Sequence, residues 1–135
     1  PPKDIPSSVN ISENVRLSGN LNVAGFFGAT TFYSAVRNGG SWDYKQQGAK
    51  FQDFGNYNFG VTGRALGFSK NVLLRMAGWA QTRAGTSDPA WRSPLGKAPF
   101  GDDPNDQKWI QEGIDDYENG TQNAEFWDDA QFCRN

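Results

Sequence analysis

Residues 51–67 read FQDFGNYNFGVTGRALG, and their glycines constrain the fold more than any other feature of the sequence. Gly60, Gly63 and Gly67 are three and four residues apart, which places them on one stripe of a helix expected over residues 54–66. Each glycine costs a helix interior about 0.5–1 kcal/mol relative to alanine. We therefore expect the stripe to make a compensating close contact, either with a neighbouring helix or with a ligand.

The spacing of apolar residues and the capping signals predict a mainly α domain, a single compact unit of about four to six helices with long loops rich in glycine and proline. Ser69 is placed to cap a helix over residues 70–84, which is the expected neighbour of the glycine stripe. Asp103 and Pro104 predict the start of a helix over residues 104–118. Asp53 is the expected cap of the glycine-rich helix. Further helices are expected from Thr30 or Thr31 to Val36, over the segment SENVRLS, and over the segment TQNAEFWDDAQFC.

The 135 residues have the size of one domain. Residues 1–29 are rich in Pro, Ser, Asn and Gly, and we expect a connector with little core, followed by the folded domain over residues 30–135. Residues 85–101 contain three prolines and predict a long loop that closes the site. The polar beginning and the lack of a membrane-length apolar run predict a soluble fragment of a longer protein.

Histidine is absent, and the single cysteine, Cys133, lies near the end of the sequence. This composition excludes Ser-His-Asp and Cys-His catalytic groups and argues against a zinc site, so we expect no metal and no cofactor. Acid–base chemistry must then use Asp, Glu, Lys, Arg, Tyr or amide side chains. The net charge of −2 and the pI near 5.0 give no overall attraction to nucleic acid, although they leave room for a local basic cleft.

Two groups of charged residues are candidates for function. The segment GDDPNDQ brings together Asp102, Asp103 and Asp106, which can cap a helix, hold a cation or supply an acid–base pair. Basic residues interleaved with aromatic ones surround the glycine stretch, and they either grip a phosphate backbone or form a solvated rim. These basic residues are Lys45, Lys50, Arg64, Arg75 and Arg83.

Four segments together resemble one family of bacterial toxins. They are FYSAVRNGGSWDYKQQG, DFGNYNFGVTGRALGF, NVLLRMAGWAQ and FGDDPNDQKWIQEGIDDY, and they are similar, in this order, to the domain called polymorphic toxin type 44. The resemblance covers residues 31–118. It implies a C-terminal payload of a larger secreted or contact-dependent toxin, which is delivered into competing bacteria and paired with a cognate immunity protein. It also implies RNase activity. Many relatives have His at the position of Asn58, so this chain either does not need an imidazole or is attenuated.

We expect the site at the glycine stretch. For an RNase, Asp53 takes the proton of the 2′-hydroxyl, Arg64 or Lys45 stabilises the phosphate, and Asn58 lines the same pocket as Asp53 and Arg64. The residues expected to bind the substrate around this group are Lys45, Tyr57, Gly60, Gly63, Asp102, Asp103 and Asp106.

Two other functions compete with the RNase. A glycosidase attacking peptidoglycan would draw its acid and base from Asp53 and the Asp102–Asp106 group, and the acidic pI, the aromatic content and the absence of histidine suit it. A non-catalytic module would instead stack sugars on Trp42, Trp91 and Trp109. A cleft with convergent charged groups favours an enzyme, whereas a flat aromatic face favours the module.

Overall fold

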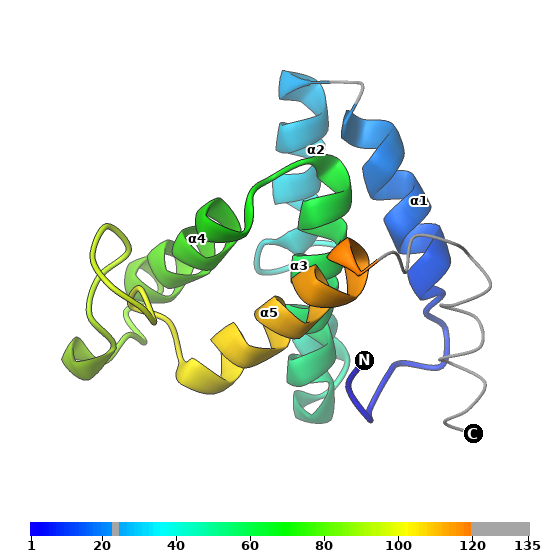
Figure 1. Ribbon diagram of the computed structural model, residues 1–135. Coiled ribbons are helices and arrows are strands. Elements are labelled where there is room, and N and C mark those ends of the chain that lie inside the picture. Colours follow the sequence, from blue (N-terminus) through cyan, green and yellow to red (C-terminus); the bar gives the residue numbers. More distant parts are fainter. Residues whose placement is uncertain (23–24, 120–135) are drawn as a thin grey trace.

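Helix α3 (Gln52–Leu66) lies at the centre of the computed structural model, which describes residues 1–22 and 25–119. Helix α1 (Ile11–Asn22) packs along one side of α3, and helix α5 (Pro104–Glu118) crosses it (Figure 1). The described residues form five α-helices and no strand, which confirms the predicted mainly α domain. The helix expected over TQNAEFWDDAQFC lies outside the described residues, as does Cys133.

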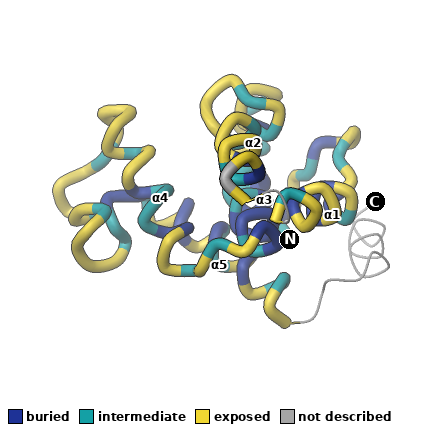
Figure 2. The backbone as a smooth tube through the Cα atoms, turned by 90° about the horizontal axis from the view of Figure 1, so that it is seen from above, coloured by how far each residue is buried: buried dark blue, intermediate teal, exposed yellow. Residues whose placement is uncertain are grey.

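The main hydrophobic core lies between α1 and α3. Phe54, Tyr57 and Val61 of α3 are fully buried there, together with Ile11 of α1. Figure 2 shows the buried residues in dark blue where these helices meet. The expectation that residues 1–29 contribute little core is wrong; whether they also serve as a connector stays a prediction.

The sequence signal of α1 is weak because its buried face is half polar. Ile11 and Val15 are four residues apart and face α3, but Asn14 and Ser18 are buried on the same side. The side-chain amide of Asn14 donates to the hydroxyl of Tyr44 at 2.9 Å. The Ser18 hydroxyl has no hydrogen-bond partner among the described residues. Two polar residues therefore occupy positions where apolar residues would have indicated a core helix.

The glycine stripe lets α3 and α5 pack backbone against backbone. A Cβ atom at Gly60 would overlap the main-chain carbonyl of Ile110, and one at Gly113 would overlap the carbonyl of Tyr57. At Gly63 the neighbour is instead the side chain of Leu73, on the helix that follows. The close contact expected of the glycine stripe is therefore present. Gly60 makes it with α5, and Gly63 makes it with the following helix, which is the neighbour that the sequence predicts.

Helix α4 (Lys70–Arg83) begins and ends close to the predicted bounds, as does α5. The Ser69 hydroxyl accepts from the main-chain N–H of Val72, and the Asp103 carboxylate accepts from that of Asn105, as the capping signals predict. A second core lies between these two helices. It contains the buried side chains of Leu73, Leu74, Ile110 and Ile114.

Two of the predicted caps are wrong. Helix α2 (Phe26–Val36) begins after Gly25, so Thr30 and Thr31 lie inside it and their hydroxyls donate to the main-chain oxygen of Phe27. Helix α3 follows directly on two 3₁₀ turns, η1 (Tyr44–Gln47) and η2 (Ala49–Phe51). Asp53 therefore lies inside the first turn of α3 and does not cap it.

The predicted loop over residues 85–101 contains one 3₁₀ turn, η3 (Pro89–Trp91). It folds back on itself and on α4. The main-chain N–H of Gly101 donates to the carbonyl of Trp91 at 2.6 Å, and the Ser87 hydroxyl donates to the carbonyl of Gly101 at 2.6 Å. The carbonyl of Phe100 lies against Gly78 of α4, where a Cβ atom would overlap it.

Candidate active site

A cleft of about 840 Å³, named the main cleft below, opens between α2, the first half of α3, α4 and the N-terminal end of α5. Its walls carry aromatic side chains, and its polar residues include both amides and ionisable groups. The aromatic residues are Tyr33, Trp42, Tyr44, Phe59 and Trp79. The ionisable residues are Arg37, Asp43, Lys45, Arg83, Asp102, Asp103 and Asp106, and the amides include Gln52 and Asn56.

Asp102 is the most strongly perturbed acid of the main cleft. It is 3% exposed, and its Oδ2 accepts from the side-chain amide of Gln107 at 2.7 Å. Burial raises the pKa of Asp102 to about 6, the hydrogen bond from Gln107 opposes this rise, and the neighbouring Asp106 charge adds to it. The Asp102 carboxyl can therefore hold or release a proton near neutral pH.

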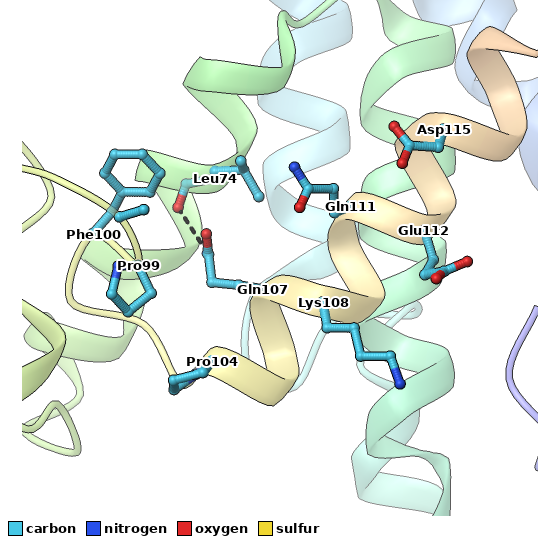
Figure 3. Close-up of a pocket in the computed structure, with 10 residues that line it drawn as sticks. Leu74, Pro99, Phe100, Pro104, Gln107, Lys108, Gln111, Glu112 and Asp115 are labelled. Atoms are coloured by element: carbon cyan, nitrogen blue, oxygen red, sulfur yellow. Dashed lines mark hydrogen bonds between the residues drawn. The ribbon is translucent and has the colours of Figure 1, made fainter.

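Gln107 fixes the position of that carboxyl. Its amide also donates to the main-chain oxygen of Leu74 at 3.1 Å, so one side chain ties Asp102 to both α5 and α4. Figure 3 shows Gln107 reaching from α5 towards Leu74. Gln107 also lines a second, smaller pocket of about 370 Å³, together with Pro99, Phe100 and Lys108.

Asp106 lies in the first turn of α5, and its Oδ1 accepts from the amide of Gln52 on α3 at 3.1 Å. Burial raises the pKa of Asp106. The negative charges of Asp103 and Asp53 add to this rise, and the hydrogen bond from Gln52 and the positive charge of Lys45 oppose it. The close crossing of α3 and α5 thus brings an amide of one helix to a carboxylate of the other.

Asp103 lines the main cleft as well, but its carboxylate also caps α5. Asp53 lies near this acidic group, because its Oδ1 accepts from the side-chain amide of Asn105 at 3.0 Å. It is not among the described residues that line the main cleft. Lys45 does line it.

Asn58 and Tyr57 lie in the core instead. Asn58 is 1% exposed, and its Oδ1 accepts from the amide of Asn14 at 3.0 Å. The hydroxyl of Tyr57 donates to Asp116 at 2.7 Å. Gly60 and Gly63 are buried in the helix contacts described above.

Arg64 is at the other end of α3, where it pairs with Glu118 at 2.9 Å and donates to the main-chain oxygen of Phe68. The structure therefore brings Lys45, Asp102, Asp103 and Asp106 together. It does not bring Asp53, Asn58 and Arg64 into one pocket, because the helix positions of these three residues face different neighbours.

Comparison with known families identifies the chain. The family model described as bacterial toxin 44 matches residues 48–119. The chain belongs to the bacterial toxin 44 family. This confirms the resemblance noted in the sequence. No curated protein and no solved structure matches the chain.

The toxin 44 match covers α3, α4, the loop and α5 and leaves out α1, α2 and η1. The matched part includes Gln52, Asp102, Asp106 and Gln107, whereas Lys45 and Trp42 lie outside it. Sequence reasoning missed both glutamines. A signal was present for Gln107, which follows the three aspartates in GDDPNDQ, but nothing in the sequence indicated that Gln52 would face Asp106.

The described residues contain neither a cluster of metal ligands nor a helix that could span a membrane. No three Asp, Glu, Cys or His side chains group as metal ligands in residues 1–22 and 25–119. None of the helices in that part of the chain has the length and hydropathy that a membrane crossing requires.

Proposed function

We propose that this toxin domain is a hydrolase that cleaves the glycan of peptidoglycan with the Asp102–Asp106 pair. The observation that carries the proposal is the buried carboxyl of Asp102, whose pKa of about 6 lies well above the ordinary value, beside a second carboxyl in a cleft with aromatic walls. Cleavage of a glycosidic bond needs one protonated and one ionised carboxyl group. Aromatic rings such as Trp42 and Trp79 suit the apolar faces of sugar rings.

Each carboxyl then has its own role. Asp102 protonates the leaving oxygen of the glycosidic bond, since a group with a pKa of about 6 keeps about a tenth of its molecules protonated at pH 7. Asp106, whose carboxylate accepts from Gln52 and lies near the positive charge of Lys45, accepts the proton of the attacking water. Gln107 and Gln52 hold the two carboxyls in place from α5 and α3.

RNA is the second candidate substrate, because Arg37, Lys45 and Arg83 also line the main cleft. Four aspartates line the same cleft, however, namely Asp43, Asp102, Asp103 and Asp106. A polyphosphate chain needs a net positive surface, and this cleft does not offer one. The charge of the main cleft therefore favours a glycan, and an RNase would use Asp106 and Lys45 in place of Asp53 and Arg64.

The purified chain distinguishes these substrates. We expect it to release soluble fragments from peptidoglycan sacculi and to leave ribosomal and transfer RNA intact, and Asp102→Asn should lower the release at least a hundredfold. Asp115→Asn is the matched control, because Asp115 is an exposed aspartate of the same helix. RNA cleavage with intact sacculi would contradict the proposal. Binding of sacculi without release would instead indicate the sugar-binding module.

Cells provide the corresponding test of delivery. We expect the chain to lyse bacteria when it carries an export signal and to be tolerated in the cytoplasm, because peptidoglycan lies outside the inner membrane. The proposed biology is that of a payload delivered into target bacteria by a larger toxin, with a cognate immunity protein protecting the producer. Killing in the cytoplasm with degraded RNA would favour the RNase.

A further inference from the structure

Residues 70–101, named the basic arm below, consist of α4 and the loop that follows it. Figure 1 shows the arm extending to one side, away from α1 and α2. Leu73, Leu74 and Gly78 are the buried residues of α4, and the loop is largely exposed (Figure 2). The arm therefore offers a large accessible surface that the fold itself does not cover.

The charge of the arm is opposite to that of the rest of the chain. Its basic residues are Lys70, Arg75, Arg83, Arg92 and Lys97, and Asp88 is its single acidic residue. The whole chain nevertheless has a net charge of −2. The arm contains five of the thirteen basic residues but one of the fifteen acidic ones, so it creates a local positive field.

Leu95 lies in the loop of the arm with 94% of its surface exposed. Nη1 of Arg75 donates to the carbonyls on both sides of it, to Pro94 at 2.8 Å and to Gly96 at 2.9 Å. The Arg75 guanidinium also lies over the ring of Phe100, 4.5 Å from its centre. A charged side chain of α4 therefore fixes the backbone around a leucine that the described residues leave almost fully exposed.

Other apolar side chains of the arm are exposed as well. Trp79 is 48% exposed and Val72 is 42% exposed. Trp79 and Arg83 lie in contact, with the guanidinium 5.3 Å from the ring centre, and both residues line the main cleft. A partner held on the arm is consequently held beside the cleft.

We infer that the basic arm is the docking surface for an acidic protein, with Leu95 as its apolar anchor. The positive charge selects an acidic partner and speeds its approach, and the prearranged loop lowers the entropy cost of binding. A protein suits this surface better than RNA does, because Leu95 and Val72 are aliphatic and cannot stack on bases, although Trp79 can. We expect the bound partner to inhibit hydrolysis in the main cleft, and this expectation rests on the function proposed for that cleft.

The partner is found without relying on toxicity. A library of genomic fragments from the producing bacterium is screened for interaction with the full chain carrying Asp102→Asn, and each recovered polypeptide is purified and titrated against the full chain. We expect Leu95→Asp to weaken binding at least about thirtyfold and Lys97→Glu about tenfold. The matched controls, Leu17→Asp and Lys3→Glu, change the same residue types at exposed positions outside the arm and should alter binding less than twofold.

The inference would be overturned if no binding polypeptide is recovered, or if the arm and control variants weaken binding equally. It would also be overturned if the arm variants mainly weaken binding to transfer RNA or to phosphatidylglycerol vesicles. Circular dichroism of each variant establishes that it is folded. Release of fragments from sacculi is measured separately. Arm binding without such release contradicts the proposed function alone, whereas release with binding elsewhere contradicts the docking surface alone.

Discussion

The side-chain amide of Gln107 in α5 lies 2.7 Å from Oδ2 of Asp102, which immediately precedes the N-cap residue of that helix. The same amide nitrogen donates to the carbonyl of Leu74 on α4. The proton affinity of Asp102 therefore depends on how α4 and α5 pack together. A buried carboxyl without this hydrogen bond would be even harder to ionise.

Replacing Gln107 with methionine tests this relationship. Gln107→Met keeps the length of the side chain but removes the hydrogen bond that favours the ionised carboxylate, so the pKa of Asp102 should rise further above 6. If Asp102 is the proton donor, the alkaline limb of the activity profile on sacculi moves to higher pH. A carbon-13 NMR titration of the Asp102 carboxyl measures the same shift without substrate.

Gln111→Met is the control for that experiment. Gln111 lies one turn further along α5 and lines the smaller pocket, and no hydrogen bond joins it to Asp102. Its pH profile should match that of the unmodified chain. A profile that moves equally in both variants would assign the effect to the helix and not to the hydrogen bond.

Asp102 should also make stability depend on pH. Its pKa is about 6 in the folded chain and about 4 in an unfolded one, so the folded state binds the extra proton between these values. The resulting stabilisation is present below pH 4 and is lost as the pH rises through 6. At pH 7 the buried charge costs up to about 2–3 kcal/mol relative to a neutral group.

Asp102→Asn should therefore raise the free energy of unfolding at pH 7 while abolishing hydrolysis, and the gain should shrink towards pH 4. Urea unfolding at pH 4, 5.5 and 7 measures the difference between the two proteins at each pH. An asparagine oxygen can still accept from Gln107. A variant that is less stable at pH 7 than the unmodified chain would show that the carboxylate is well solvated or paired.

Much of the fold was predictable because its signals are local. Ser69, Asp103 and Pro104 act at helix ends, where side-chain and backbone chemistry alone decide the outcome. The site was less predictable because it depends on a crossing between distant segments. The aspartates of GDDPNDQ were identified, but the facing Gln52 follows from the α3–α5 contact, and the interior position of Asn58 follows from its pairing with Asn14 on α1.

The α3–α5 crossing can be tested with alanine at two glycines of the same helix. Gly60→Ala places a Cβ against the main chain of Ile110, which cannot move aside, so we expect a loss of about 3 kcal/mol despite the better helix propensity of alanine. Gly55→Ala meets no atom within 4 Å and should stabilise the chain by about 0.5–1 kcal/mol. Urea unfolding at pH 5.5 measures both. Equal stabilisation by the two variants would contradict the close crossing.

Gly63 falls between these cases. A Cβ atom there meets the end of the Leu73 side chain, which can change its rotamer. Gly63→Ala should cost less than Gly60→Ala, whereas Gly63→Leu adds a volume that the buried contact with Leu73 cannot accept. We expect the leucine variant to unfold the domain or to abolish toxicity.

The last prediction concerns Asn58, where the resemblance noted in the sequence implies a His in many relatives. If imidazole chemistry had been lost at this position, Asn58→His would raise activity. The structure leads to the opposite expectation, because Asn58 is 1% exposed, pairs with Asn14 and does not line the main cleft. A larger ring in this close-packed interior should destabilise the domain by about 1–3 kcal/mol and leave hydrolysis by the folded fraction unchanged.

Asn58→Leu separates the structural role of Asn58 from a catalytic one. Nδ2 of Asn58 has no hydrogen-bond partner among the described residues, and Asn14 keeps its bond to Tyr44 after the change. The substitution removes a buried unpaired nitrogen but leaves one amide hydrogen of Asn14 without its acceptor, so it should lower the free energy of unfolding by about 1–3 kcal/mol and preserve the activity of the folded fraction on sacculi. Loss of activity in a folded Asn58→Leu variant, or a gain of activity in Asn58→His, would show that Asn58 of α3 takes part in catalysis and would contradict this expectation.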